Sequence, residues 1–323
     1  MITTKKESGT LKYLVTGGAG FIGSTIVKYL LSKSFDVVVL DDLSSGKREN
    51  LAGLNVEFYL GSIEDKSIVA KAINGCGGVF HLAALVSVPE CTQKWDFGHS
   101  VNLLGTINIF DAATKENSIP VVYASSAAIY GNQSNAICDD TKTVPMPISP
   151  YGADKLACEH QARAFNEVFK LPSFGLRFFN VFGPNQNADS PYSGVISKFV
   201  DNALKKNAHI IFGTGEQTRD FIFVSDVALG MWRAMSKIQN TQDCYVSNLC
   251  TGRQHSLLDL VQKIDQIIEG SSKNLRFRNA RVGDIEHSAG SIENLTKLLG
   301  QMEFVEFEPG LEKLVKHNST EAS

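Results

Sequence analysis

The stretch that most constrains this chain is a short apolar run that leads without a gap into a glycine-rich turn. Residues 11–16 (LKYLVT) are apolar enough for a buried strand, and Gly17, Gly20 and Gly23 follow with the spacing Gly-x-x-Gly-x-x-Gly. Gly17 allows a tight turn, Gly20 allows backbone N–H groups to approach a pyrophosphate, and Gly23 allows close packing of the next helix. That helix, predicted over residues 24–32, directs its positive N-terminal end toward the turn. The pattern predicts a nucleotide-binding βαβ unit.

An acidic residue at the end of the second predicted strand indicates which nucleotide is bound. Residues 35–40 form this strand, and Asp41 follows it at roughly the 20-residue distance from the glycine turn that a ribose-binding acid requires. A carboxylate accepts hydrogen bonds from both ribose hydroxyls of NAD, but it repels the additional phosphate of NADP. We therefore expect NAD as the cofactor, while Lys47 and Arg48 in the following loop leave NADP open as an alternative.

Composition excludes several classes of protein. The 323 residues are 43% hydrophobic and 20% charged, enough for a large core and too many for a single mononucleotide unit. A net charge of −3 gives no basic surface for nucleic acid or anionic membranes. Six scattered cysteines without a C-x-x-C pair indicate buried thiols in a reducing compartment and no zinc site. With a polar start and no long apolar run, we expect a cytoplasmic protein without membrane, nucleic-acid or metal partners.

Strand and helix patterns alternate over the first half of the chain. Strands are also predicted at residues 56–60, 78–84, 120–124 and 174–179, and helices at residues 66–73, 95–117 and from 151 onward. This order is typical of an α/β fold of Rossmann type, with a doubly wound parallel sheet. It predicts that the chain continues the nucleotide-binding unit into one large domain.

The pattern loosens in the second half. A proline-rich loop is expected over residues 132–150 and a turn over 180–186. Three further helices are predicted over residues 195–205, 225–237 and 256–269, with a strand near Tyr245. Residues after about Lys313 are expected to fray. These segments predict a smaller C-terminal α/β domain.

Polar side chains gather where the strand at residues 120–124 ends and where a later helix begins. Ser125 and Ser126 follow the strand directly, and ligands bind at the carboxyl ends of strands in open α/β sheets. Tyr151 and Lys155 stand four residues apart, so a helix places them on one face with the ammonium near the phenol. Because a neighbouring cation stabilises a phenolate, this spacing predicts acid–base catalysis.

Three other basic side chains carry weaker signals. His81 ends a predicted buried strand, and we expect it to pack beneath the cofactor rather than to act as an acid or base. Arg219 and Arg281 are far apart in sequence, yet guanidinium groups match phosphate oxygens in bidentate geometry, so the pair is a candidate clamp for a diphosphate. An ordinary surface ion pair remains the alternative for either arginine.

Taken together, these motifs resemble the extended short-chain dehydrogenases/reductases, and within them the UDP-sugar 4-epimerases. The resemblance rests on Gly17-x-x-Gly20-x-x-Gly23, Asp41, Ser126, Tyr151-x-x-x-Lys155 and Arg219, and extends from about residue 11 to residue 299. It implies a tightly held NAD in a domain formed by residues 1–177 and about 221–249. It also implies a UDP-hexose bound by a smaller domain formed by about 178–220 and 250–323.

The resemblance also assigns roles residue by residue. It implies catalysis by Ser126, Tyr151 and Lys155. The implied cofactor-binding residues are Gly17, Gly20, Phe21, Ile22, Gly23, Asp41, Ser45, Gly46, Ser62, Ile63, Leu82, Ala83, Ala84, Asn102, Tyr151 and Lys155. The implied substrate-binding residues are Ser87, Ser125, Ser126, Tyr151, Asn180, Gln186, Arg219, Arg281, Asp284 and Ser288. Ser62 departs from the aspartate usual at its position, which weakens one contact to the adenine.

Two features narrow the subgroup that the chain resembles. Related dehydratases and decarboxylases carry acidic residues just after the catalytic serine, whereas this chain has Ala127 and Ala128. Ser288 matches a position where a tyrosine closes the sugar pocket of hexose-only epimerases, and a serine leaves room for an N-acetyl group. The resemblance therefore implies interconversion of UDP-GlcNAc and UDP-GalNAc, and also of UDP-Glc and UDP-Gal, through a transient 4-keto sugar.

Alternatives remain open at this stage. A UDP-uronate 4-epimerase or a nucleotide-sugar dehydrogenase/reductase would use the same scaffold, and a non-catalytic NAD-sensing module is an alternative from another class. Intact Ser126, Tyr151 and Lys155 argue against the last. The resemblance also implies a homodimer in which the helices at residues 95–117 and 151–169 pair across a two-fold axis.

Overall fold

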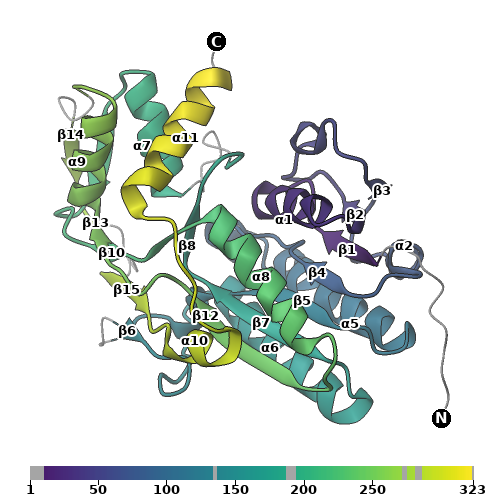
Figure 1. The fold of residues 1–323 in the computed structure, drawn as a ribbon. Coiled ribbons are helices and arrows are strands. Elements are labelled where there is room, and N and C mark those ends of the chain that lie inside the picture. The colour runs from purple at the N-terminus through teal and green to yellow at the C-terminus, as the bar shows by residue number, and fades with distance from the viewer. Residues whose placement is uncertain (1–10, 134–136, 187–193, 271–274, 281–285, 322–323) are drawn as a thin grey trace.

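A parallel sheet of seven strands lies at the centre of the larger part of the molecule (Figure 1). The computed structural model describes residues 11–133, 137–186, 194–270, 275–280 and 286–321. The strand order is β12-β7-β5-β4-β1-β2-β3, and every neighbouring pair is parallel. The strands are β1 (Lys12–Thr16), β2 (Asp36–Asp41), β3 (Glu57–Leu60), β4 (Val79–His81), β5 (Val121–Ser126), β7 (Ser173–Phe178) and β12 (Cys244–Leu249). The predicted fold class is therefore confirmed.

Helices cover both faces of this sheet because successive side chains of a buried strand point to opposite faces. In β1, Tyr13 and Val15 pack into one core with α1 (Phe21–Ser32) and α8 (Val224–Ile238), whereas Leu14 packs into the other. The helices of the second core are α2 (Lys66–Ile73), α5 (Gly105–Lys115) and α6 (Pro150–Phe169).

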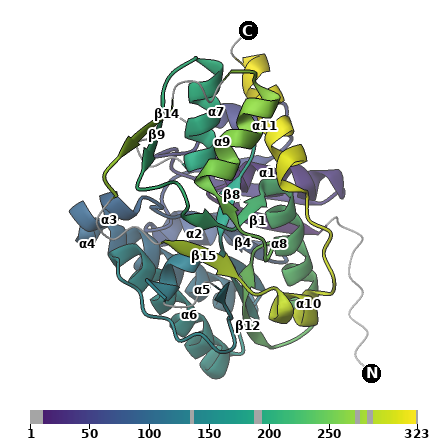
Figure 2. The same cartoon turned by 90° about the vertical axis from the view of Figure 1, so that its left-hand side faces the viewer.

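The smaller part of the molecule combines short sheets with three helices. Helices α7, α9 and α11 lie side by side around a separate hydrophobic core (Figure 2). A four-stranded mixed sheet has the order β13-β10-β15-β6, and two parallel pairs are β11-β8 and β14-β9. The helices are α7 (Val195–Leu204), α9 (Leu257–Ile267) and α11 (Phe307–Glu321). The strands are β6 (Ile137–Cys138), β8 (Asn180–Phe182), β9 (His209–Phe212), β10 (Thr218–Arg219), β11 (Phe221–Phe223), β13 (His255–Ser256), β14 (Leu275–Arg278) and β15 (His287–Gly290).

The helical region predicted over residues 95–117 is confirmed, because the chain is helical from α4 (Trp95–His99) through a π-helical turn (Ser100–Leu104) to the end of α5 at Lys115. The π-helical turn within this region was not predicted. The backbone oxygen of Asn102 accepts hydrogen bonds from Thr106 Oγ1 at 2.6 Å and from Cys158 Sγ at 3.3 Å. Such side-chain bonds interrupt the regular backbone ladder and widen a helix locally, which residue types alone do not reveal.

Three other boundaries differ from prediction. The fourth strand ends at His81 rather than Ala84, because Ala83 N donates to the side chain of Thr16 instead of continuing the ladder. The predicted loop at residues 132–150 contains β6, which pairs with β15, and the predicted turn at 180–186 begins with β8. Strands β6 and β8 are both short, and each is stable only because a distant strand pairs with it.

The expected fraying after about Lys313 is also wrong. Helix α11 continues to Glu321, and Leu311, Leu314 and Val315 are buried in the core of the smaller part. The division into two domains stays a prediction, and α10 (Glu293–Leu299) lies against α8 and β12 of the large sheet.

The described residues contain neither a membrane-spanning helix nor a cluster of metal-binding side chains. None of the helices there combines the length and apolarity needed to cross a membrane. In the same part of the chain, no group of three or more His, Cys, Asp or Glu side chains stands where it could hold a metal ion. The six cysteine thiols are free, and all are buried except that of Cys244, which is half-buried.

Candidate active site

The glycine turn between β1 and α1 has no room for side chains. Gly17 has a φ of 67°, and a Cβ there would lie 2.7 Å from Ala83 N, while a Cβ on Gly23 would lie 2.0 Å from Gly17 O. Helix α1 begins at Phe21 without a side-chain cap, so N–H groups of its first turn remain available to an anion. The turn therefore forms a cradle of backbone donors at the carboxyl edge of the sheet, with Gly20 and Ile22 beside it.

Asp41 lies at the end of β2 beside this turn. Its carboxylate is 6% exposed and accepts hydrogen bonds from Ala19 N at 2.9 Å and Leu43 N at 2.8 Å. Burial raises the pKa of Asp41, and these two backbone donors partly offset the effect. Each oxygen retains a lone pair for a ribose hydroxyl. Gly46, preceded by Ser45, packs against the same carboxylate, since a Cβ there would lie 3.1 Å from Oδ1.

The loop after β4, residues 82–84, is held by a chain of buried polar groups centred on His81. Thr106 Oγ1 donates to Asn102 O, so it accepts from His81 Nε2 at 3.0 Å. His81 Nδ1 then accepts from Thr16 Oγ1 at 2.7 Å, and that oxygen accepts from the N–H groups of Leu82 and Ala83. Burial, followed by the charge of Lys155, lowers the pKa of His81 to about 3. His81 is thus a structural residue in the core and a neutral imidazole, as predicted, while its place beneath the cofactor stays a prediction.

Asn102 lies in the π-helical turn and has no exposed surface. Its Oδ1 accepts from Leu85 N at 2.8 Å, and its Nδ2 donates to Leu85 O at 3.1 Å. The amide thus fixes the backbone that follows Ala84. The predicted role of Asn102 in cofactor binding stays a prediction. Asn102 would act indirectly, by fixing the loop after β4.

Three further predicted residues lie on neighbouring segments. Ser62 follows β3, and its Oγ donates to Glu64 Oε2 at 3.2 Å. Ile63 is buried in the core between α2 and α5. Ser87 caps α3 (Val88–Gln93), because its Oγ accepts from Glu90 N. Their contacts to cofactor or sugar stay predictions.

The predicted catalytic residues meet where β5 ends and α6 begins. Ser149 caps α6 by accepting from Gly152 N, and Pro150 opens the first turn, so Tyr151 stands in that turn. Lys155 is 4% exposed, donates from Nζ to Ala124 O at 3.0 Å, and lies 5.8 Å from the Tyr151 ring centroid. Ser126 Oγ accepts from Ala128 N, which leaves the hydroxyl hydrogen to donate elsewhere.

The predicted substrate residues of the smaller part adjoin this edge. Arg219 of β10 and Ser288 of β15 are register partners, and Arg219 Nη1 donates to Thr218 O at 2.8 Å. Asp220 connects them to β8, because Asp220 N donates to Ser288 O and Asn180 N donates to Asp220 O. Asn180 stands two residues after Phe178, which is the register partner of Ser126. The fold thus brings Asn180, Arg219 and Ser288 to one side of the catalytic strand end.

The remaining predicted substrate residues differ in their surroundings. Gln186 Oε1 accepts from Ser197 Oγ at 2.5 Å, and Nε2 donates to Val181 O. Ser125 is 2% exposed, and its Oγ donates to Glu159 Oε1 at 2.6 Å, so its predicted sugar contact competes with this bond. Arg281 and Asp284 lie outside the described residues.

Sequence reasoning missed three buried charges near the site. Asp220 has no exposed surface and accepts from Thr251 N, Thr251 Oγ1 and Gly252 N. Glu159 and Arg177 form a buried ion pair beneath the catalytic edge. Two features of the sequence could have revealed the pair. Arg177 is a charged residue inside an otherwise apolar strand, and Glu159 is a carboxylate four residues after Lys155.

Comparisons with known proteins agree with this geometry. The model of the NAD dependent epimerase/dehydratase family matches residues 13–250. The UDP-glucose 4-epimerase of Mycolicibacterium smegmatis is 33% identical over 312 residues, which are 95% of this chain and 98% of the relative.

Two solved structures are similar over nearly their whole length. The UDP-glucose 4-epimerase of Thermotoga maritima, crystallised with UDP-glucose, has a TM-score of 0.91 and 32% identity, covering 97% of this chain and 100% of that one. The UDP-N-acetylglucosamine 4-epimerase of Methanobrevibacter ruminantium M1, in complex with UDP-N-acetylmuramic acid, has a TM-score of 0.90 and 34% identity, with coverages of 97% and 99%. With the family model matching most of its length, this chain belongs to the NAD-dependent epimerase/dehydratase family.

Proposed function

We propose that this chain is a UDP-sugar 4-epimerase that interconverts UDP-GlcNAc and UDP-GalNAc, and also UDP-Glc and UDP-Gal, through a transient 4-keto sugar. The observation that carries the proposal is the meeting of Ser126, Tyr151 and Lys155 at the end of β5, with a buried ammonium 5.8 Å from the phenol ring. Family membership and the similarity to two 4-epimerase structures support the same reaction.

The residues present fit NAD. The side-chain-free cradle at Gly17 and Gly23 suits a pyrophosphate, and the buried carboxylate of Asp41 suits a ribose diol. The loop after β4 adds a small-residue wall at Ala83 and Ala84, held in place by Thr16. Held by the cradle at Gly17 and by Asp41, NAD would supply a reversible hydride acceptor for C4 of the sugar.

The chain's own residues supply the proton transfer. Tyr151 as phenolate removes the proton of the sugar 4-hydroxyl and later returns it. Lys155 stabilises the phenolate by its charge, and its bond to Ala124 O holds the ammonium in position. The Ser126 hydroxyl is available to donate to the same sugar oxygen, which eases movement of the proton.

The choice of N-acetylated sugars rests on Ser288. Its place beside Arg219 supports a sugar-facing role, and a serine occupies much less space than a tyrosine. The Methanobrevibacter relative, a UDP-N-acetylglucosamine 4-epimerase, supports the same choice. Ala127 and Ala128, directly after Ser126, supply no acid for dehydration or decarboxylation.

The test is to incubate the purified protein, without added NAD, with each of four UDP-sugars: UDP-Glc, UDP-Gal, UDP-GlcNAc and UDP-GalNAc. We expect each sugar to be converted into its 4-epimer, with UDP-GlcNAc and UDP-GalNAc turning over at least as fast as the others. A dehydrogenase/reductase would instead consume added cofactor in proportion to product, and a UDP-uronate epimerase would act only on UDP-uronates. Absence of turnover on all four sugars, and also on UDP-glucuronic acid with and without added NAD, would leave the NAD-sensing module.

A further inference from the structure

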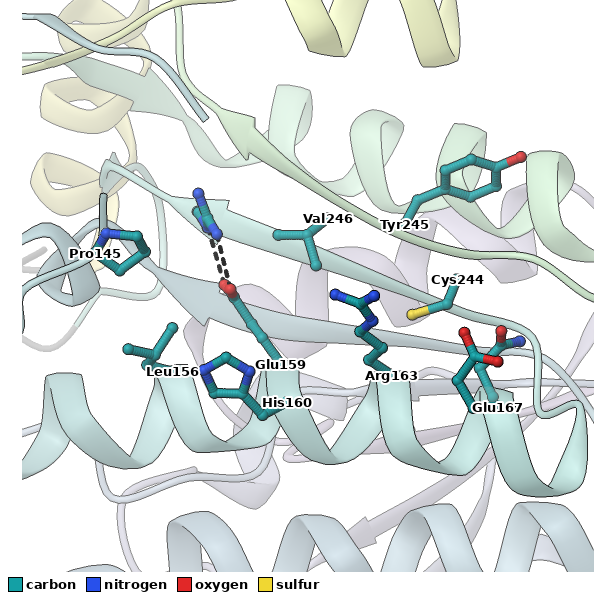
Figure 3. Close-up of a pocket in the computed structure, with 11 residues that line it drawn as sticks. Pro145, Leu156, Glu159, His160, Arg163, Glu167, Cys244, Tyr245 and Val246 are labelled. Carbon is teal, nitrogen blue, oxygen red and sulfur yellow. Dashed lines mark hydrogen bonds and ion pairs between the residues drawn. The ribbon is translucent and has the colours of Figure 1, made fainter. Parts of the chain in front are cut away.

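A buried ion pair fastens the catalytic helix to the sheet. Glu159 of α6 receives two parallel hydrogen bonds from Arg177 of β7, Nε to Oε1 at 2.9 Å and Nη2 to Oε2 at 2.8 Å. Figure 3 shows Glu159 reaching from α6 to the guanidinium. The two side chains are only 7% and 8% exposed. Ser125 Oγ donates a third hydrogen bond to this carboxylate, to Oε1 at 2.6 Å.

The pair belongs to a row of polar residues that crosses three neighbouring strands. Ser125, Arg177 and Asn248 are register partners on β5, β7 and β12. Arg177 Nη1 donates to Tyr130 Oη at 2.8 Å, and Tyr130 Oη donates to Asn248 Oδ1 at 2.7 Å. Asn248 Nδ2 in turn donates to Cys138 O of β6. The row therefore joins the catalytic helix to the sheet of the smaller part.

Its position along α6 connects it to the catalytic residues. Tyr151, Lys155 and Glu159 follow one another at intervals of four, so they occupy three consecutive turns on one helical face. Lys155 is bonded to Ala124 O and Glu159 to Ser125 Oγ, so two successive turns are attached to successive residues of β5. Ser126 is the next residue of that strand. Two attachment points define how the helix is shifted and rotated relative to the strand end.

Around Glu159, apolar side chains do not fill the whole space between α6 and β12. An open pocket of about 460 Å³ lies against the pair and is lined by residues of both α6 and β12. Leu156, His160 and Arg163 line its helix side, and Val246 lines its sheet side (Figure 3). Beside this pocket the ion pair is a direct contact between α6 and β7, whereas the apolar packing of α6 includes Ala162, which is buried in the core with α5.

We propose that Glu159, Arg177 and Ser125 are positioning residues that set the distance between the Tyr151 hydroxyl and Ser126. This inference rests on the proposed function. Replacing a buried ion pair with apolar side chains of similar volume often preserves stability. A displacement of about 1 Å at reacting groups, by contrast, can cost about a hundredfold in rate. The two effects are therefore separable.

The experiment compares the parent protein with the double variant Glu159→Leu/Arg177→Met and with the single variant Glu159→Gln. The control is Asp111→Asn, which breaks the exposed i,i+4 pair with Lys115 on α5. Epimerisation kinetics, retained NAD and the urea midpoint are measured for each. We expect the double variant to fold and to keep its NAD, with a urea midpoint below that of the parent because Ser125 Oγ and Tyr130 Oη each lose a hydrogen-bond partner. Its kcat should fall about ten- to a hundredfold, while its KM changes less than about threefold. The control variant Asp111→Asn should have the kcat, the NAD content and the urea midpoint of the parent.

Ser125→Ala separates positioning from sugar binding. As a positioning residue, Ser125 lowers kcat when truncated and leaves KM unchanged, whereas a direct sugar contact would raise KM. A kcat within about twofold of the parent in the folded double variant would overturn the proposal. If that variant does not fold, an unchanged kcat in Glu159→Gln has the same consequence. An inactive parent would overturn the proposed function instead, and the positioning role with it.

Discussion

A single phenol, that of Tyr151, carries the acid–base step of the proposed epimerisation. Its place in the first turn of α6 follows from the cap formed by Ser149 and from Pro150, both local features of the sequence. What the fold adds is the buried ammonium of Lys155 and the end of β5 opposite it. Neighbouring polar residues such as His81 shape the site without touching the reaction, because their hydrogen-bonding capacity is already used.

Tyr151→Phe removes the hydroxyl and keeps the ring. We expect kcat to fall about a thousandfold, because no other group takes the proton, while the protein retains its NAD. Turnover of UDP-sugar and the content of bound NAD are measured together. The matched control is Tyr245→Phe, whose hydroxyl bonds Asp243 near the start of β12. A loss of less than about tenfold in the Tyr151 variant would contradict its role as the base.

His81→Asn tests the neutral buried imidazole through its pH dependence. The folded-state pKa of His81 is lowered from 6.5 to about 3, so the folded protein binds fewer protons than the unfolded chain between these values. Stability from the neutral ring is present above pH 6.5 and is lost as the pH falls. We expect the parent to lose about 1.4 kcal/mol of unfolding free energy per pH unit relative to the variant. Urea unfolding of both proteins is measured at several pH values between about 3 and 6.5. If the unfolding free energies of parent and variant depend on pH in the same way, the prediction is wrong.

Removing the hydroxyl group of either of two buried tyrosines, Tyr123 and Tyr130, should change stability in opposite directions. Tyr123 Oη has no hydrogen-bond partner among the described residues, whereas Tyr130 Oη accepts from Arg177 and donates to Asn248. We expect Tyr123→Phe to raise the free energy of unfolding by about 1 kcal/mol and Tyr130→Phe to lower it by about 1–3 kcal/mol. Urea unfolding of both variants checks the pair, and a loss of stability in Tyr123→Phe would contradict the assignment.

At the scale of elements, α11 shows how a polar terminal segment can belong to a core. Leu311, Leu314 and Val315 recur at helical spacing, so a narrow apolar stripe was present in the sequence. The polar composition around it suggested fraying. Only the presence of α7 and α9 beside the stripe shows that it has a surface to pack against.

Leu314→Ala tests whether α11 is part of the folded unit. Leu314 is 1% exposed, so truncation should lower the free energy of unfolding by about 2–5 kcal/mol. Lys316→Ala, at an exposed position of the same helix, is the control and should change it by less than about 0.5 kcal/mol. Equal midpoints in urea for both variants would mean that α11 frays after all.

For the whole molecule, the arrangement of the two parts decides which residues can act together. Strands β8, β10 and β15 bring Asn180, Arg219 and Ser288 to the edge at which β5 ends. The same arrangement leaves large apolar side chains uncovered on α4 and the π-helical turn, with Trp95, Phe97 and Leu104 exposed by 61%, 46% and 48%. Such a surface is consistent with the homodimer inferred from family resemblance.

Trp95→Glu tests the predicted homodimer. A charge in an apolar interface has no partner, so we expect the variant to sediment as a monomer at micromolar concentration while the parent sediments as a dimer. Phe277→Glu, on the exposed side of β14, is the control and should sediment as the parent does. A parent that is monomeric at all concentrations would refute the prediction.

Local patterns in the sequence were sufficient for the glycine turn, for Asp41 at the end of β2 and for the Tyr151–Lys155 spacing. Each depends on neighbours within a few residues, where backbone geometry and steric limits act directly. The pairing of Glu159 with Arg177, the two partners of His81 and the meeting of Arg219 with Ser288 join residues far apart in the chain. Only the tertiary structure decided them, because a buried polar group is stable only where a distant partner completes its hydrogen bonds.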